Sequence, residues 1–206
     1  MSPLIPRLAV PALVLAALAG CSSGGGSKPS ATPTPTSSPT GTPAIAGVAV
    51  YPDQVHTHVT HKVVYPRHPP TGGPHWAPVG LGVYGWQACA VYTEPVVDEF
   101  AVHSLEHGAV WLTYQPSVPA QDVAALGVLD GIRPDYVLVS PYPGQPSPIM
   151  ATAWGLQLGV SSANDPRLAQ FVREYAGGAQ GGEFGADCAH GSTIAQAKGA
   201  LARSGS

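Results

Sequence analysis

Two histidines and a glutamate stand close together in the segment His103-Ser104-Leu105-Glu106-His107. Residues four apart in a helix lie on one face, so the imidazoles of His103 and His107 can both reach one metal ion. Glu106 lies about 60° around the helix axis from His103, close enough to be a ligand, an orienting group or a base. We therefore take these three residues as candidate ligands of a transition metal.

Five of the eight histidines lie further upstream, from His56 to His75. His75 follows a loop rich in proline and glycine, residues 69–74, which would present its imidazole rigidly, as a preorganised site requires. We add His75 to the candidate ligands. Imidazole and carboxylate donors favour borderline ions, so the expected cofactor is zinc or copper(II). The sequence leaves open whether the other four upstream histidines join the site: His56, His58, His61 and His68.

Two other interpretations of the motif compete with a metal-binding site. It matches the H-x-x-E-H pattern of the inverzincin metalloproteases, but those enzymes are far larger and share only these five positions, so we do not expect a protease. Alternatively, both histidines are structural. His107 would then meet the negative end of the helix dipole, and His103 would hydrogen-bond a neighbouring backbone group.

The N-terminus carries the pattern of an exported lipoprotein. A short apolar run ends in Leu18-Ala19-Gly20-Cys21, which has the small-residue cleavage site of a secretory signal and resembles the bacterial lipobox. We expect residues 1–20 to be a lipoprotein signal peptide, Cys21 to be acylated with palmitate, and residues 21–44 to form a Pro/Ser/Thr/Gly tether. The expected location is the extracytoplasmic face of the cell membrane, with the lipid anchor as the contact to that membrane.

Once Cys21 is acylated, Cys89 and Cys188 remain. An even pair of cysteines in an exported domain predicts a disulfide bond. The competing interpretations are metal thiolates and a redox pair, and no C-x-x-C spacing supports redox chemistry.

Composition narrows the function classes. Charged residues make up 10% of the chain, the net charge is −3 and no cluster of Lys or Arg occurs, so we expect no nucleic-acid binding, which depends on neutralised phosphates. Apolar residues make up 44%, enough for a core in a single compact domain. We assign residues 45–190 to that globular domain and residues 191–206 to a flexible C-terminal tail.

The elements that must position these residues follow from local patterns. Apolar periodicity predicts helices over residues 95–107 and 119–129, and a third that begins at Pro166 after a cap at Asn164 or Asp165. Runs of β-branched and aromatic residues predict strands over residues 59–65, 109–114, 136–140 and 149–154. Because strands and helices do not alternate regularly, we predict an α+β fold with a mostly antiparallel sheet packed with about three helices.

Several longer segments carry a family resemblance: Tyr65-Pro66, Pro69-Pro70-Thr71-Gly72-Gly73-Pro74-His75, Gly82-Val83-Tyr84, His103 to Trp111, and Ala153-Trp154-Gly155. Together they resemble the bacterial domain-of-unknown-function family 3105, which is often found in exported or membrane-anchored proteins. The resemblance covers about residues 55–188. It implies that His75, His103, Glu106 and His107 belong to one set, and it implies no established activity.

Three functions remain open from the sequence. The first is a membrane-anchored lipoprotein that binds a transition metal through the His-x-x-Glu-His motif. The second is a metal-dependent hydrolase with Glu106 as the base for a metal-bound water, although no substrate-pocket signature favours an enzyme. The third is a structural or partner-binding lipoprotein without metal. The sequence does not identify a protein partner or an oligomeric state.

Overall fold

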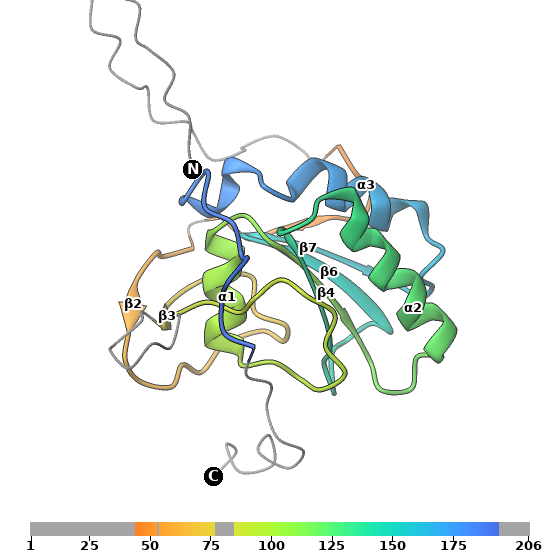
Figure 1. Ribbon diagram of the computed structural model, residues 1–206, viewed down its shortest axis with the longest axis horizontal. Coiled ribbons are helices and arrows are strands. Elements are labelled where there is room, and N and C mark those ends of the chain that lie inside the picture. The colour runs from red at the N-terminus through yellow and green to blue at the C-terminus, as the bar shows by residue number, and fades with distance from the viewer. Residues whose placement is uncertain (1–43, 53, 77–84, 194–206) are drawn as a thin grey trace, which may run out of the picture. The chain divides into compact units, whose positions relative to one another are not determined.

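The computed structural model describes residues 44–52, 54–76 and 85–193 (Figure 1). The expected signal peptide, Cys21, all but the last residue of the tether, and the segment Gly82-Val83-Tyr84 lie outside these residues. Among the helices of the described part, none has the length and apolar character needed to cross a membrane.

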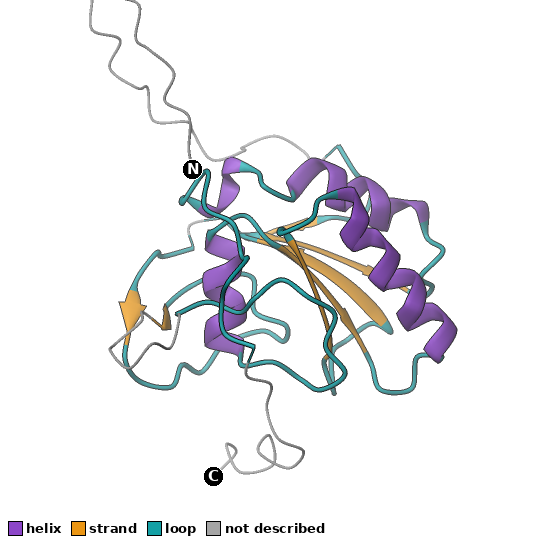
Figure 2. Ribbon diagram, in the orientation of Figure 1, coloured by secondary structure: helices purple, strands orange, loops and turns teal. Residues whose placement is uncertain are grey.

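A five-stranded sheet lies at the centre, with the strand order β1-β7-β6-β4-β5 (Figure 2). Strands β4 and β5 are parallel, and the other three pairings are antiparallel. The mostly antiparallel sheet of an α+β fold is thus confirmed. The strands are β1 (Ala49–Val50), β4 (Val110–Tyr114), β5 (Val137–Pro141), β6 (Ile149–Ala153) and β7 (Leu156–Val160).

The three predicted helices are present as α1 (Asp98–Glu106), α2 (Ala120–Val128) and α3 (Pro166–Tyr175). Two short 3₁₀ helices follow α2 and α3, η1 (Leu129–Ile132) and η2 (Ala179–Gly181). The Asp165 side chain accepts a hydrogen bond from the backbone N–H of Arg167 at 3.0 Å and caps α3. Gly108 follows α1 with φ +94°, and a Cβ there would lie 3.0 Å from the Gly178 carbonyl oxygen, so only glycine fits this turn.

Each face of the sheet packs against different helices, because successive side chains of a strand point to opposite faces. Val110 and Leu112 of β4 belong to the core on the α2 and α3 face, together with Phe171 of α3. Trp111 points to the other face and packs in a second core with Leu105 of α1. The sheet therefore separates α1 from α2 and α3 (Figure 2).

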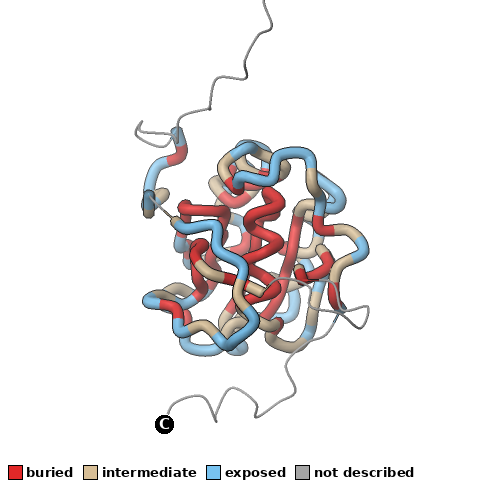
Figure 3. Tube along the Cα trace, turned by 90° about the vertical axis from the view of Figure 1, so that its left-hand side faces the viewer, coloured by how far each residue is buried: buried red, intermediate tan, exposed pale blue. Residues whose placement is uncertain are grey.

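Helix α1 is buried on every side, from Glu99 to Glu106 (Figure 3). One side rests on the sheet. The opposite side is covered by two short parallel strands, β2 (His58–Val59) and β3 (His75–Trp76). The C-terminal segment joins them, since the Glu183 N–H donates a hydrogen bond to the Glu106 carbonyl at 3.2 Å. Polar residues on the outer side of α1 are thereby enclosed.

The predicted strand over residues 59–65 is wrong beyond its first residue. The Val63 N–H donates to the Glu99 carboxylate at 2.8 Å, and the buried Tyr65 donates its hydroxyl hydrogen to the Pro74 carbonyl at 2.7 Å. Side-chain and loop partners therefore replace a strand ladder in this segment. Strand β7 was not predicted; it follows a turn at Gly155, where φ is +70°.

The chain remains packed beyond the predicted end of the domain. The Ser192 N–H donates to the Trp86 carbonyl at 2.7 Å, and its carbonyl accepts from Ala88 at 2.8 Å. Ser192 is therefore part of the packed structure rather than of a flexible tail. The structure also pairs Cys89 with Cys188 in a disulfide, with Cα atoms 5.2 Å apart.

Candidate metal centre

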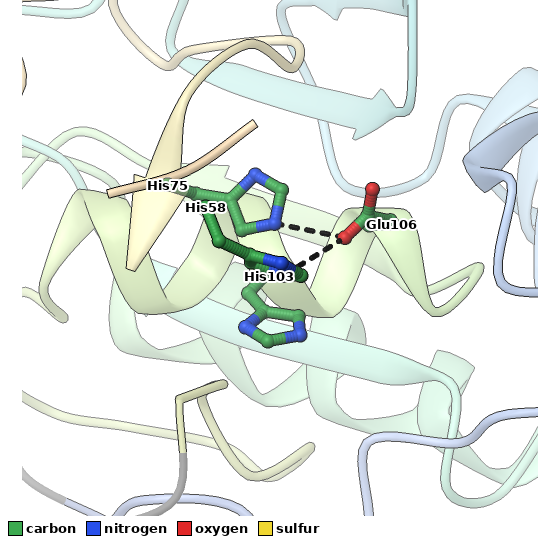
Figure 4. Close-up of side chains that lie close together, drawn as sticks. All are labelled: His58, His75, His103 and Glu106. Atoms are coloured by element: carbon green, nitrogen blue, oxygen red, sulfur yellow. Dashed lines mark hydrogen bonds and ion pairs between the residues drawn. The ribbon is translucent and has the colours of Figure 1, made fainter. Parts of the chain in front are cut away.

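Four side chains from two layers of the molecule converge on the outer side of α1 (Figure 4). His58 and His75 lie opposite each other in the parallel β2–β3 pairing, while His103 and Glu106 project from α1. Each offers one ligand atom, and these four atoms lie within 4.8 Å of one another. All are buried except His58. We call this set the inner group.

Hydrogen bonds to the backbone fix the tautomers of the buried histidines. A carbonyl oxygen can only accept, so an imidazole nitrogen bonded to it carries the hydrogen. Nδ1–H then donates a hydrogen bond to the backbone carbonyl. Nε2 keeps the lone pair that can bind a metal, and the partner at the other ring nitrogen orients the ring as in most histidine ligands of metal sites. Three histidines have this arrangement, at 2.7–2.9 Å: His75 on Gly73, His103 on Gly85 and Trp76, and His107 on Asp187.

The Glu106 carboxylate faces imidazoles at both oxygens. Its Oε1 accepts from Nδ1 of His56 at 2.6 Å. Its Oε2 lies 2.8 Å from Nε2 of His75 and 3.5 Å from Nε2 of His58. Because the His75 hydrogen is on Nδ1, two lone pairs meet between His75 and Glu106. Such a contact requires a positive charge, which a proton or a metal ion can supply.

The charge states also suit a cation. Burial by itself would raise the pKa of Glu106, but hydrogen bonds from His75, whose Nε2 then carries the proton in this contact, and from His56 outweigh burial and hold the pKa at about 2. Burial lowers the pKa of His103 to about 4, and the neighbouring histidines act in the same direction against the hydrogen bond to Trp76. At neutral pH the site therefore holds an anionic carboxylate and a neutral His103, the forms that coordinate metals.

A second set, the outer group, lies on the other side of His103. It consists of His103, His107 and Glu183, whose ligand atoms also lie within 4.8 Å of one another. Nε2 of His107 is 3.0 Å from Oε2 of Glu183, and the Glu183 side chain is 44% exposed. This group therefore offers three protein ligands, one of which is the solvent-exposed Glu183 carboxylate.

Aromatic rings enclose the two groups. The His56 ring stacks on Trp154 with centroids 4.4 Å apart. Trp86 lies against His107, with centroids 4.9 Å apart. These rings shield one side of each group from water, which strengthens the electrostatic interactions there.

The structure divides the predicted ligand set in two. His75, His103 and Glu106 meet in the inner group, whereas His107 lies in the outer group and shares His103 with it. The backbone bond that the structural interpretation expects of His103 is present, but it occupies only Nδ1.

Of the histidines left open by the sequence, His58 joins the inner group. His56 is not a member, but it hydrogen-bonds Oε1 of Glu106, the carboxylate oxygen that faces away from His75. His68 lies elsewhere, with Nδ1 2.9 Å from the Tyr142 hydroxyl. His61 is exposed and belongs to neither group.

Glu183 was not predicted from the sequence. The sequence feature that could have indicated it is the pair of glycines directly before it, Gly181 and Gly182. Gly182 has φ +93°, and a Cβ there would lie 2.7 Å from the His56 ring. The glycines let this segment pass close to the end of α1 and bring an acidic side chain to the site.

A comparison with protein-family models places both groups of ligands within one family domain. A family model described as a protein of unknown function (DUF3105) matches residues 56–190, which include both groups of ligands. No curated protein and no solved structure matches the chain.

Proposed function

The chain belongs to the DUF3105 family of proteins of unknown function, and we propose that it binds one transition-metal ion through its inner group. The observation that carries this proposal is the 2.8 Å approach of Nε2 of His75 to Oε2 of Glu106, in a site where the His75 hydrogen is held by the Gly73 carbonyl. A metal ion bound to both atoms satisfies the two lone pairs and the buried negative charge at once.

The donor set indicates which ions fit. Three imidazoles and one carboxylate suit borderline ions, so zinc and copper(II) are the candidates. Four protein ligands make the closed set typical of sites that hold a metal, whereas catalytic zinc sites use three and keep a position for water. Both Glu106 oxygens already face imidazoles, which leaves neither as a free base for water. The geometry therefore favours metal binding over hydrolysis.

We propose further that binding takes place at the outer face of the cell membrane, with Cys21 lipidated. The Cys89–Cys188 pair supports an oxidising compartment, and the lipobox-like Leu18-Ala19-Gly20-Cys21 supports the anchor. Metabolic labelling with palmitate should mark the wild type and not Cys21→Ser. An unlabelled wild type would contradict the anchor without touching the metal proposal.

Elemental analysis of the exported protein, purified without a histidine tag, tests the metal proposal. The wild type should retain about one equivalent of zinc or copper, and Glu106→Gln should retain none. The amide keeps the shape of the carboxylate and can still accept the bond from His56, so this variant should fold. His61→Ala is the matched control, because it removes a histidine that lies outside both groups. Absence of metal in the wild type after exposure to both ions would overturn the proposal.

A further inference from the structure

His103 lies between the inner and outer groups and belongs to both. Its ring centroid is 4.8 Å from that of His75 in the inner group and 4.7 Å from that of His107 in the outer group. The two groups are therefore adjacent, and their common member is one imidazole of α1.

This imidazole has only one lone pair to offer. Nδ1 of His103 is 2.8 Å from the Gly85 carbonyl and 2.9 Å from the Trp76 carbonyl, so Nδ1 carries the hydrogen and Nε2 is the sole ligand atom. One nitrogen lone pair binds one ion. The two groups cannot both be complete at the same time, and they act as two alternative positions for a single ion.

We propose that the ion enters and leaves through the outer group, and that His103 keeps hold of it while His107 and Glu183 are exchanged for the inner ligands. This proposal rests on metal binding by the inner group. Ligand exchange around a retained His103 involves no change of oxidation state. The protons balance as well, because the ion displaces the proton between His75 and Glu106, and His107 takes up one proton when it returns to its 3.0 Å contact with Glu183.

The solvent-exposed side chains around each group, which we call its rim, determine which group an incoming ion meets first. The exposed side chains of the inner rim are imidazoles, His56 at 43% and His58 at 39% exposure. Glu106, the carboxylate of the inner group, is only 3% exposed. The outer rim presents the Glu183 carboxylate at 44% exposure. A hydrated cation is attracted to a solvent-facing negative charge, so it meets the outer group first.

The number of protein ligands in each group determines where the ion finally rests. Three protein ligands hold an ion less firmly than four, and the inner group adds a buried carboxylate whose attraction is less screened by water. The segment that carries Glu183 is fixed to the end of α1 by the bond from its N–H to the Glu106 carbonyl. Transfer between the positions therefore needs exchange of ligands and no large movement of the chain.

Cobalt(II), a visible substitute for zinc, gives a direct test in the full-length exported protein. Loading is followed by absorbance in a stopped-flow instrument, and release is followed after addition of excess EDTA. Glu183→Gln should slow both rates by about tenfold or more while the equilibrium Kd and the single equivalent bound stay unchanged, because Glu183 is absent from the final position. Glu174→Gln, which removes another exposed carboxylate from α3, should leave both rates unchanged.

Each alternative result is distinct. Unchanged rates in Glu183→Gln, or two equivalents bound by the wild type, would overturn the shared-ligand route. Slower loading with unchanged release would also overturn it, because it would reduce Glu183 to long-range attraction. No cobalt, zinc or copper bound by the wild type would instead overturn metal binding by the inner group, and the route with it.

Discussion

The two faces of the sheet are built on different principles. The face under α2 and α3 is apolar, with Leu126, Leu168 and Phe171 all fully buried. The face under α1 also has an apolar layer, around Trp111, but the outer side of α1 is polar and equally buried. The first face stabilises the fold by removing apolar surface from water. On the second face, the burial of polar groups costs part of that stabilisation.

Buried polar groups on α1 are tolerated because they have partners. Glu99 accepts from the Val63 N–H at 2.8 Å, and the Ser104 hydroxyl donates to the Gln87 carbonyl at 2.7 Å. Both partners come from loops, and the Ser104 hydroxyl is also within 3.2 Å of the Phe100 carbonyl one turn back in the helix. The α1 face therefore depends on how loops distant in sequence are held in place, whereas the α2 and α3 face depends mainly on the packing of apolar side chains.

The disulfide should show the largest difference between the faces. Cys89 and Cys188 are separated by 99 positions, and removing such a link with the double change Cys89→Ser and Cys188→Ser should cost about 4–5 kcal/mol in free energy of unfolding. Urea denaturation measures the loss. Hydrogen exchange should become faster in α1 than in β6, because the disulfide holds the C-terminal segment that covers α1. Uniform acceleration across both faces would contradict the comparison.

Phe171→Ala should break the apolar face alone. Phe171 is 0% exposed, and truncation of a buried phenylalanine costs about 3–5 kcal/mol. The free energy of unfolding should fall by this amount, measured by urea denaturation, while the folded fraction retains the metal content of the wild type. Loss of metal from the folded protein would show that the two faces are not separable.

Asp98→Asn should change the α1 face in a pH-dependent way. Burial raises the pKa of Asp98 from 3.8 to about 7, and Glu99 adds to the rise, against the hydrogen bond from Tyr142. The folded state therefore binds a proton that the unfolded state has lost between these values, and stability falls as pH rises from about 4 to about 7.

Asparagine has no charge to bury, so this part of the slope should disappear in Asp98→Asn. The variant should match the wild type near pH 4 and be the more stable protein at pH 8. Urea midpoints of metal-free protein across this range measure the difference. Parallel curves for the two proteins would show that the Asp98 charge is not the cause.

Local patterns were sufficient where neighbours in sequence decide the structure. The proline at the first turn and the acidic cap predict α3, and apolar runs predict β4 and β6. The spacing of His103 and His107 predicts a shared ion, and both do lie in the outer group. These features depend on residues within a few positions of one another.

The remainder of the site depends on contacts between distant segments. His56 bonds Glu106 across 50 positions, and His107 bonds the Asp187 carbonyl across 80. Periodicity carries no information about such distances. For the same reason the segment 59–65 resembles a strand in its sequence, while the Glu99 carboxylate and a loop carbonyl take its hydrogen bonds.

The most direct test of the inner group is a crystal structure of the zinc-loaded protein, purified with the Cys89–Cys188 disulfide formed and with anomalous data collected at the zinc edge. One strong peak is expected about 2.0–2.2 Å from Nε2 of His58, His75 and His103 and from an oxygen of Glu106. No peak in this group after zinc loading, or an ion coordinated only by other residues, would overturn zinc binding by the inner group.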